Sequence, residues 1–365
     1  MRVDINPFYT RASDNIDSDE KFVKLFSPEI LSIFKDYPIW HAVNILRSSP
    51  GGGKTTLFKI LTPKVLALIK SSKSHDDHCK ELFNVLKELA VYDSKGNLNI
   101  AAAFTAFNKQ YTTIEHLAIP ENEKVRLFSS LLNTRIILTV LKSICFVKGI
   151  SYPKDLNRIT FNDQHNIEIP VQIRDLLTGH ELYEWATSEE ELISDRIDSI
   201  HPKATEDLKG QDTLYSLDFL SPSNLLLDNK RLELKVVVML DDVHNLSASQ
   251  RGFLVQSIID KRPMVNTWIS ERLKALTMEE LLSEGSRAGR DINIIELENF
   301  WSKRNKQFEN FAKSVANRRV EIFFESKKDF ASFLSEKMSI KYQNIIKDAL
   351  INIQARIKKK LWKLK

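Results

Sequence analysis

Residues 48–55, Ser-Ser-Pro-Gly-Gly-Gly-Lys-Thr, contain three adjacent glycines in a chain of 365 residues that has only ten glycines in total. Adjacent glycines destabilise helices and strands, so this cluster predicts a loop with a special backbone conformation. Residues 41–49 predict a short buried strand before it, and residues 54–72 have apolar side chains at helical spacing after it. A strand, a glycine-rich turn and a helix form the context in which backbone N–H groups surround a phosphate.

The cluster fits the pattern G-x-x-x-x-G-K-[S/T] except at its first position, which is Ser48. Ser48 lies where the loop leaves the strand, farthest from the lysine, so we interpret it as a tolerated variation. Lys54 would contact the β- and γ-phosphates, and the Thr55 hydroxyl would ligate Mg²⁺. A glycine-rich turn without a ligand is the alternative. The residues that we expect at the nucleotide are Pro50, Gly51, Gly52, Gly53, Lys54, Thr55 and Thr56.

A second motif lies at residues 234–242, an apolar run that ends in two carboxylates. Such runs are typical of a parallel strand buried on both faces. Asp241 would hold Mg²⁺, and Asp242 would polarise the water that attacks the γ-phosphate. The alternative is a strand that ends in two solvated aspartates. Because both motifs occur in the right order and context, the sequence favours a nucleotide site.

Further strands are predicted at 263–270 and 291–300, with a helix over 271–284 between them. Alternating strands and helices indicate an α/β fold with a central parallel β-sheet, as in a P-loop NTPase. The two motifs are separated by roughly half of the chain, so we predict a large helical insertion between them. We assign residues 1–74 and 221–300 to the ATPase core, 75–220 to a mainly helical insertion, and 301–365 to a helical, lysine-rich C-terminal region.

Polar residues of the 266–272 segment are candidates for contact with the γ-phosphate. Arg272 directly follows this strand, and the carboxyl ends of parallel strands form the ligand rim, so we expect Arg272 to act within its own subunit. Arg290 and Arg287 precede the next strand, and we expect Arg290 to contact a neighbouring subunit. Ordinary surface arginines are the alternative for each. The polar candidates for a γ-phosphate sensor are Asn266, Thr267 and Ser270.

These segments resemble the AAA+ and STAND branch of P-loop ATPases, and above all bacterial proteins similar to origin-recognition-complex ATPases. The resemblance rests on Asn-Pro-Phe at 6–8, the loop at 48–56, and residues 236–244 and 266–272. It implies ATP and Mg²⁺ as cofactors and adenine binding near Asn6, Pro7 and Phe8. It also implies oligomers with an arginine acting in trans, and a role in anti-phage defence. Two departures are the long separation of the motifs and the lack of a winged-helix pattern in the C-terminal region.

Composition limits the compartment and the partners. The net charge of +5 equals the five lysines of residues 358–365, so the rest of the chain is near neutral. That tail is the only sequence support for binding nucleic acid. Two cysteines, no signal-peptide pattern and no apolar run of membrane length predict a cytoplasmic protein without a membrane partner. Residues 75–79, His-Asp-Asp-His-Cys, are better explained as a helix start than as a metal site.

The sequence therefore predicts a Mg²⁺-dependent ATPase that acts as a switch or motor in a larger assembly, either a homo-oligomer or a complex with a separate effector protein. A regulatory module that holds ATP or ADP with negligible turnover is one alternative, since Asp242 is one methylene shorter than the more common glutamate. A nucleic-acid-binding loader ATPase is another.

Overall fold

Five parallel strands form the centre of the protein, which we describe from a computed structural model. The structure describes residues 18–40, 43–162, 169, 171–176, 178–198, 213–261, 263–273, 292–324 and 330. The strands lie in the order β2 (Ile100–Ala106), β6 (Lys235–Asp241), β7 (Asn266–Arg272), β1 (Val43–Ser48) and β8 (Ile292–Glu296). Nearly all of their side chains are buried, because helices cover both faces of the sheet. The predicted α/β fold with a central parallel sheet is confirmed.

Strand β7 lies between β1 and β6, so the two strands that carry the sequence motifs are not neighbours. The β1–β7 register pairs Ser48 with Arg272, and the β6–β7 register pairs Leu240 with Ile269. All three strands therefore end at the same edge of the sheet. The glycine-rich loop and the two aspartates follow β1 and β6 at this edge, where ligands of parallel sheets bind.

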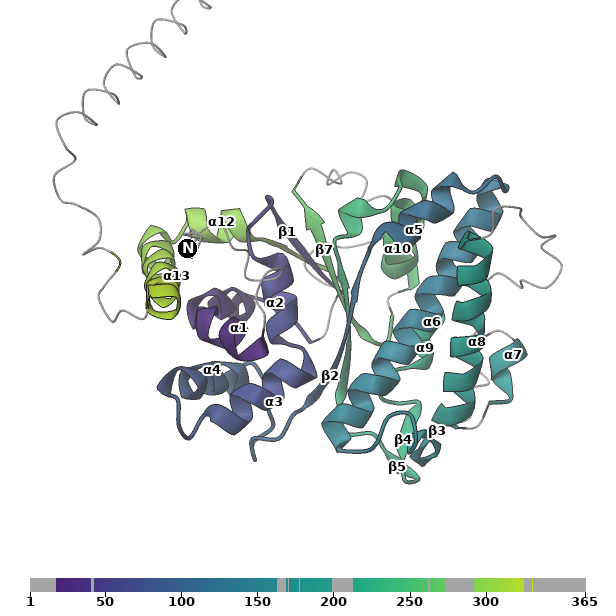
Figure 1. Ribbon diagram of the computed structural model, residues 1–365, viewed down its shortest axis with the longest axis horizontal. Coiled ribbons are helices and arrows are strands. Elements are labelled where there is room, and N and C mark those ends of the chain that lie inside the picture. The colour runs from purple at the N-terminus through teal and green to yellow at the C-terminus, as the bar shows by residue number, and fades with distance from the viewer. Residues whose placement is uncertain are drawn as a thin grey trace, which may run out of the picture. The chain divides into compact units, whose positions relative to one another are not determined.

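Helices pack on both faces of the sheet, as Figure 1 shows, and each face has its own apolar core because strand side chains alternate. Ile45 and Ile269 face one core, whereas Leu46 and Trp268 face the other. The Leu46 side holds α1 (Asp19–Leu25), η1 (Pro28–Asp36), α2 (Lys54–Ile60), α3 (Pro63–Ser72) and α4 (Asp77–Glu88). The Ile45 side holds α6 (Glu121–Lys148), α8 (Gly179–Asp198) and α10 (Ala248–Lys261).

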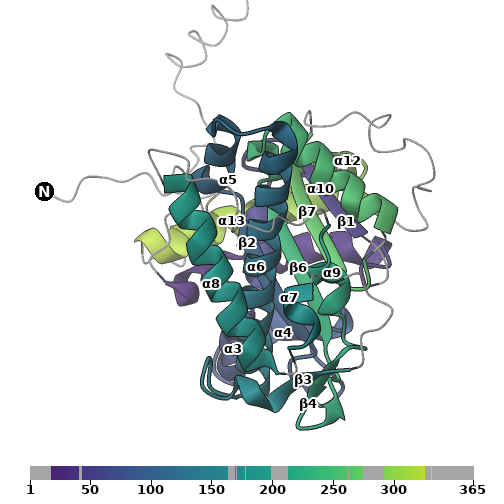
Figure 2. The same cartoon turned by 90° about the vertical axis from the view of Figure 1, so that its right-hand side faces the viewer.

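Helix α6 is the longest helix in the described part of the chain, and it runs beside α8 in front of the sheet (Figure 2). Its length and apolar composition would suffice to cross a membrane, but 67% of its most apolar window is buried inside the protein. It packs on β2, where the Ser143 hydroxyl donates a 3.0 Å hydrogen bond to the Ala102 carbonyl. Gly149, with φ +67°, ends the helix. Helix α6 is thus a core helix of the α/β unit.

The remaining elements are short and lie mostly in the connections between the large ones. An antiparallel sheet joins β3 (Ile159–Phe161), β4 (Leu225–Leu227) and β5 (Lys230–Arg231). The short helices are α5 (Lys109–Thr113), η2 (Ile114–His116), η3 (Leu156–Arg158), α7 (Val171–Arg174), α9 (Ser216–Phe219), η5 (Val243–Asn245) and α12 (Leu297–Ser302). Helix α13 (Asn305–Phe324) completes the described part of the helical C-terminal region.

Two sequence interpretations need correction. The 75–220 segment is not purely an insertion, because it contains β2, an edge strand of the central sheet. Its sequence, Ile-Ala-Ala-Ala-Phe-Thr-Ala, has few of the β-branched side chains that mark strands, so its strand signal is weak. Residues 54–72 form two helices rather than one, since Pro63 cannot continue a helix and starts α3. The helix predicted over 271–284 falls largely outside the described residues.

The chain divides into two compact units, residues Met1–Phe311 and Ala312–Lys365. The first contains the sheet, both cores and both sequence motifs. The described part of the second consists of the end of α13 and Phe330. The predicted boundary at residue 301 therefore lies slightly before the division between the units.

Candidate functional site

The glycine-rich loop leaves β1 at Ser48 and enters α2 at Lys54. Gly51 has φ +83° and Gly53 has φ +93°, a left-handed conformation that side chains disfavour. These two glycines therefore let the chain turn tightly into α2. The first N–H groups of a helix lack acceptors within it, so the end of the loop presents free donors to a ligand.

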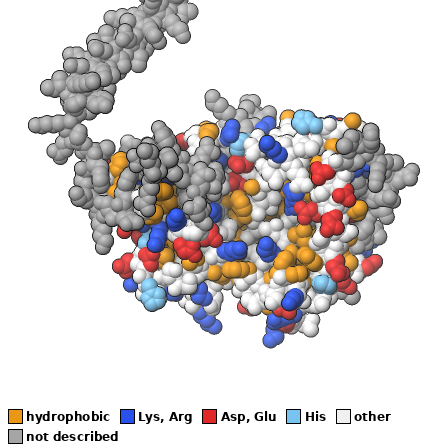
Figure 3. Space-filling model, in the orientation of Figure 1, with side chains coloured by type: hydrophobic (Ala, Val, Ile, Leu, Met, Phe, Trp, Pro, Cys, Tyr) orange, Lys and Arg blue, Asp and Glu red, His pale blue; other side chains and the backbone are white. Residues whose placement is uncertain are grey.

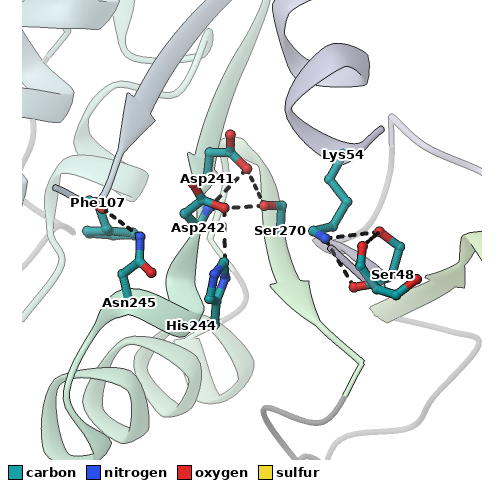
Figure 4. A network of polar contacts seen from close by, with 9 residues as sticks. Ser48, Lys54, Phe107, Asp241, Asp242, His244, Asn245 and Ser270 are labelled. Carbon is teal, nitrogen blue, oxygen red and sulfur yellow. Dashed lines mark hydrogen bonds and ion pairs between the residues drawn. The ribbon is translucent and has the colours of Figure 1, made fainter. Parts of the chain in front are cut away.

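Lys54 points back into its own loop, as Figure 4 shows. Its Nζ donates to the Ser48 carbonyl oxygen at 3.1 Å and to Ser48 Oγ at 2.9 Å. The lysine is buried, and burial lowers its pKa, although Asp241 and Asp242 partly offset this effect. Ser48 is thus part of the site: it provides two acceptors that hold the lysine in place.

The side chain of Ser48 leaves no room for a side chain at position 52, where the chain has glycine. A Cβ atom added to Gly52 would lie 2.6 Å from Ser48 Cβ and would also overlap Ser48 Oγ. We expect Gly52→Ala to lower the affinity for ATP about ten-fold or more, because the loop must shift to relieve the overlap.

The serine offers a matched control for this prediction. Ser48→Gly alone should change the affinity no more than a few-fold, because Lys54 keeps the backbone carbonyl as an acceptor. The double variant Ser48→Gly, Gly52→Ala should recover most of the lost affinity, because the overlap with Ser48 is gone and the remaining close atom, the Ser49 carbonyl oxygen at 3.2 Å, needs only a small shift. Equilibrium titration of the three variants measures this, and wild-type affinity in Gly52→Ala would contradict the described loop.

Asp241 ends β6 on the same face of the sheet as the loop, and its side chain is 1% exposed. Its Oδ1 accepts hydrogen bonds from the Ser270 hydroxyl and, at 3.0 Å, from the Asp242 amide. Burial raises the pKa of Asp241, while the hydroxyls of Ser270 and Thr55 oppose the rise. Its other oxygen, Oδ2, is buried and has no hydrogen-bond partner among the described residues.

This arrangement fits a magnesium ion. A buried carboxylate oxygen without a donor is costly unless a cation neutralises it, and Mg²⁺ binds through one or two carboxylates together with phosphate oxygens. Asp241 Oδ2 and the Thr55 hydroxyl are the groups that would hold the ion. When bound, Mg²⁺ would neutralise charge on the phosphates. Among the described residues there is no group of three or more His, Cys, Asp or Glu side chains suited to a metal.

Asp242 lies at the rim, with a side chain that is 40% exposed and a backbone φ of +58°. Its amide donates to Ser270 Oγ at 3.1 Å, which ties the end of β6 to β7. Its carboxylate lies 3.8 Å from His244 Nδ1. Burial, together with Arg272 and Lys54, lowers the pKa of His244 to about 4. His244 is therefore neutral near pH 7 and does not form a charged pair with Asp242.

The other predicted residues are placed as follows. Arg272 lies opposite Ser48 in the sheet and close enough to Lys54 and His244 to lower the pKa of both side chains. Of the three sensor candidates, Ser270 contacts Asp241, whereas Thr267 bonds the Val265 carbonyl and Asn266 begins β7 at the far edge. Asn6, Pro7, Phe8, Arg287 and Arg290 lie outside the described residues.

Sequence reasoning missed three contributors. Arg47 and Glu271 form a buried ion pair of 2.5 Å between β1 and β7, directly beneath the site. Glu298, on α12, bonds the loop at Ser49. His244 lies beside Asp242. Only His244 had a sequence signal, its place directly after the second motif, because the other contacts join segments far apart in the chain.

The 75–79 segment has a structural role, as expected. Asp76 caps α4 by accepting hydrogen bonds from the His78 and Cys79 amides, and His78 Nε2 lies 2.9 Å from the Val23 carbonyl oxygen. These residues begin a helix that packs in the core.

A groove of about 500 Å³ lies beside Thr55, over β2. Phe104 of β2 and Phe146 of α6 contribute apolar surface to it, and Lys59, Lys64 and Lys142 contribute positive charge. Figure 3 shows hydrophobic and basic side chains together on this face of the molecule. The groove adjoins the candidate nucleotide site on its Thr55 side.

The parallel sheet, the glycine-rich loop between β1 and α2, and the aspartate at the end of β6 define the class as a P-loop ATPase. The ORC-CDC6-like family model matches residues 6–365, almost the entire chain, and the chain belongs to this family of AAA+ nucleotide-binding ATPases. No curated protein and no solved structure matches the chain.

Proposed function

We propose that this chain binds ATP together with Mg²⁺, hydrolyses it, and works as a switch or motor subunit of a larger assembly. The observation that carries the proposal is the proximity of Lys54, which begins α2, to Asp241 and Ser270, which lie near the carboxyl ends of β6 and β7. A carboxylate oxygen suited to a cation and a lysine suited to phosphates, at one edge of a parallel sheet, favour a magnesium nucleotide.

Each residue then has a distinct role. Lys54 leaves Ser48 to contact the phosphates, and Thr55 and Asp241 hold the ion. Asp242 orients and polarises the attacking water, while Arg272 supplies positive charge near the transferred phosphoryl group. Ser270 fixes the Asp241 carboxylate, and through the Asp242 amide it also fixes the start of the following turn.

The wider assignments rest on the resemblance to origin-recognition-complex-like ATPases. On that basis we propose a homo-oligomer in which Arg290 reaches the nucleotide of a neighbouring subunit, a location in the cytoplasm, and a role in anti-phage defence. A separate effector protein is the other partner that such a switch would act on.

Two other functions are kept as second candidates. The exposure of Asp242 and its short side chain favour a regulatory module that holds ATP or ADP without turnover. A turnover assay separates this from an ATPase. The lysines of residues 358–365 favour a loader that binds nucleic acid. A DNA titration at increasing salt tests it, because binding through phosphates weakens steeply with salt.

The metal site gives a direct test of the proposed ATPase. Asp241→Asn removes the charge of the buried carboxylate, so we expect the Mg²⁺ concentration needed for half-maximal hydrolysis to rise about ten- to a hundred-fold. Asp36→Asn is the control, since Asp36 lies on the surface and bonds Arg304. An unchanged Mg²⁺ requirement in Asp241→Asn, or no hydrolysis in wild type, would contradict the proposal.

A further inference from the structure

A carboxylate from another part of the chain contacts the phosphate loop. Glu298 Oε1 accepts a 2.6 Å hydrogen bond from the Ser49 amide and a second, short one from the Ser49 hydroxyl. Ser49 is the second residue of the loop, directly after Ser48, which holds Lys54. The two bonds therefore join the start of the loop to α12.

The position of Glu298 follows from the sheet. Strand β8 pairs with β1 through Arg47 and Glu296, and α12 begins directly after β8. The second residue of α12 thus reaches the loop at the carboxyl edge of the sheet. The charge of Glu298 also acts on Lys54. Burial lowers the pKa of Lys54, and the nearby negative charge of Glu298 partly opposes this effect. A negative charge is consequently present at a site that must accept the negative phosphates of a nucleotide.

Glu298 stays ionised at this position. Burial opposes its ionisation, but the hydrogen bonds from the Ser49 hydroxyl and amide outweigh burial, and the pKa lies below the ordinary value. Its side chain is exposed, so solvent screens its charge, and the effect on a bound anion is modest and sensitive to salt.

We propose that Glu298 is a positioning residue of the phosphate loop that also limits the affinity for nucleotide. Its hydrogen bonds hold Ser49 and the start of the loop in place, and its charge opposes the binding of phosphates. The effect of Glu298 on nucleotide affinity rests on the proposed function. Its role in fixing Ser49 through hydrogen bonds does not.

The experiment separates the two roles by using two substitutions. Glu298→Gln removes the charge but keeps an oxygen that can accept both hydrogen bonds from Ser49. Glu298→Ala removes the charge and the acceptor oxygen together. Titration with ATP and Mg²⁺ is made at low and at high salt, and exchange of the Ser49 amide hydrogen is measured without nucleotide. Glu88→Gln is the control for net charge, because Glu88 is an exposed carboxylate on α4 that pairs with Lys35 of η1.

We expect Glu298→Gln to bind ATP about two- to five-fold more tightly at low salt, with the gain lost at high salt. We expect the Ser49 amide to exchange faster in Glu298→Ala but not in Glu298→Gln, and Glu88→Gln to behave as wild type. If wild type binds ATP and Glu298→Gln binds it equally well or more weakly, the proposed effect of Glu298 on affinity is wrong, while the proposed function stands. Absence of ATP binding in wild type would overturn the proposed function and the affinity effect together, and unchanged exchange in Glu298→Ala would overturn the hold on Ser49.

Discussion

Replacing Lys54 with alanine is expected to lower the affinity for ATP by about two orders of magnitude, because a charged partner of the phosphates is lost. The fold should persist. Lys54 is buried, but among the described residues the hydrogen bonds of its ammonium both go to Ser48, which lies in the same loop. Titration with ATP measures the affinity, and thermal unfolding monitored by circular dichroism measures the stability.

Lys59 provides the matched control, since it lies on the same helix and its ammonium lies 4.7 Å from the Phe22 ring centre. Lys59→Ala removes the same charge from α2 without touching the loop, and we expect it to bind ATP as wild type does. Equal affinities in wild type and Lys54→Ala would place the nucleotide site elsewhere.

Replacing Asp242 with asparagine is expected to slow hydrolysis by about two to four orders of magnitude, while ATP and Mg²⁺ still bind. Asparagine can adopt the left-handed backbone conformation of residue 242. The backbone amide of that residue should therefore keep its hydrogen bonds to Ser270 and Asp241. The slower hydrolysis would then result from removing the charge that polarises the attacking water. Single-turnover hydrolysis measures the chemical step, and titration in the same buffer measures binding.

Asp228→Asn controls for the backbone conformation, because Asp228 has φ +51° but pairs with Arg158 far from the loop in sequence. The Asp228→Asn variant should hydrolyse ATP at the wild-type rate. If Asp242→Asn did so as well, another group would polarise the water. If wild type showed no turnover while binding ATP, the regulatory module would replace the ATPase as the best account.

The sequence indicates the main features of this fold because its motifs are local. The glycines at 51–53 and the aspartates at 241–242 each combine a strand end with polar chemistry in a few adjacent residues. The strand that ends in these aspartates is a long apolar run, which is typical of a parallel strand buried on both faces. Strand β2 was missed because alanines fill it, and its place in the sheet depends on pairing with β6.

The parts of the site that the sequence does not indicate are contacts between distant segments. Ser48 can be recognised as a departure from the loop pattern, but its bonds to Lys54 and its overlap with any side chain at Gly52 depend on the fold of the loop. Likewise Glu298 lies in an ordinary amphipathic segment. Only the pairing of β8 with β1 brings it to Ser49.

A structure of the protein with a non-hydrolysable ATP analogue and Mg²⁺ tests the central claim most directly. The account predicts that the β- and γ-phosphates lie in the loop of residues 50–55, with Lys54 released from Ser48. It also predicts Mg²⁺ between the phosphates, the Thr55 hydroxyl and Asp241. A nucleotide bound elsewhere, or a loop in which Lys54 remains on Ser48 at saturating analogue, would contradict the account.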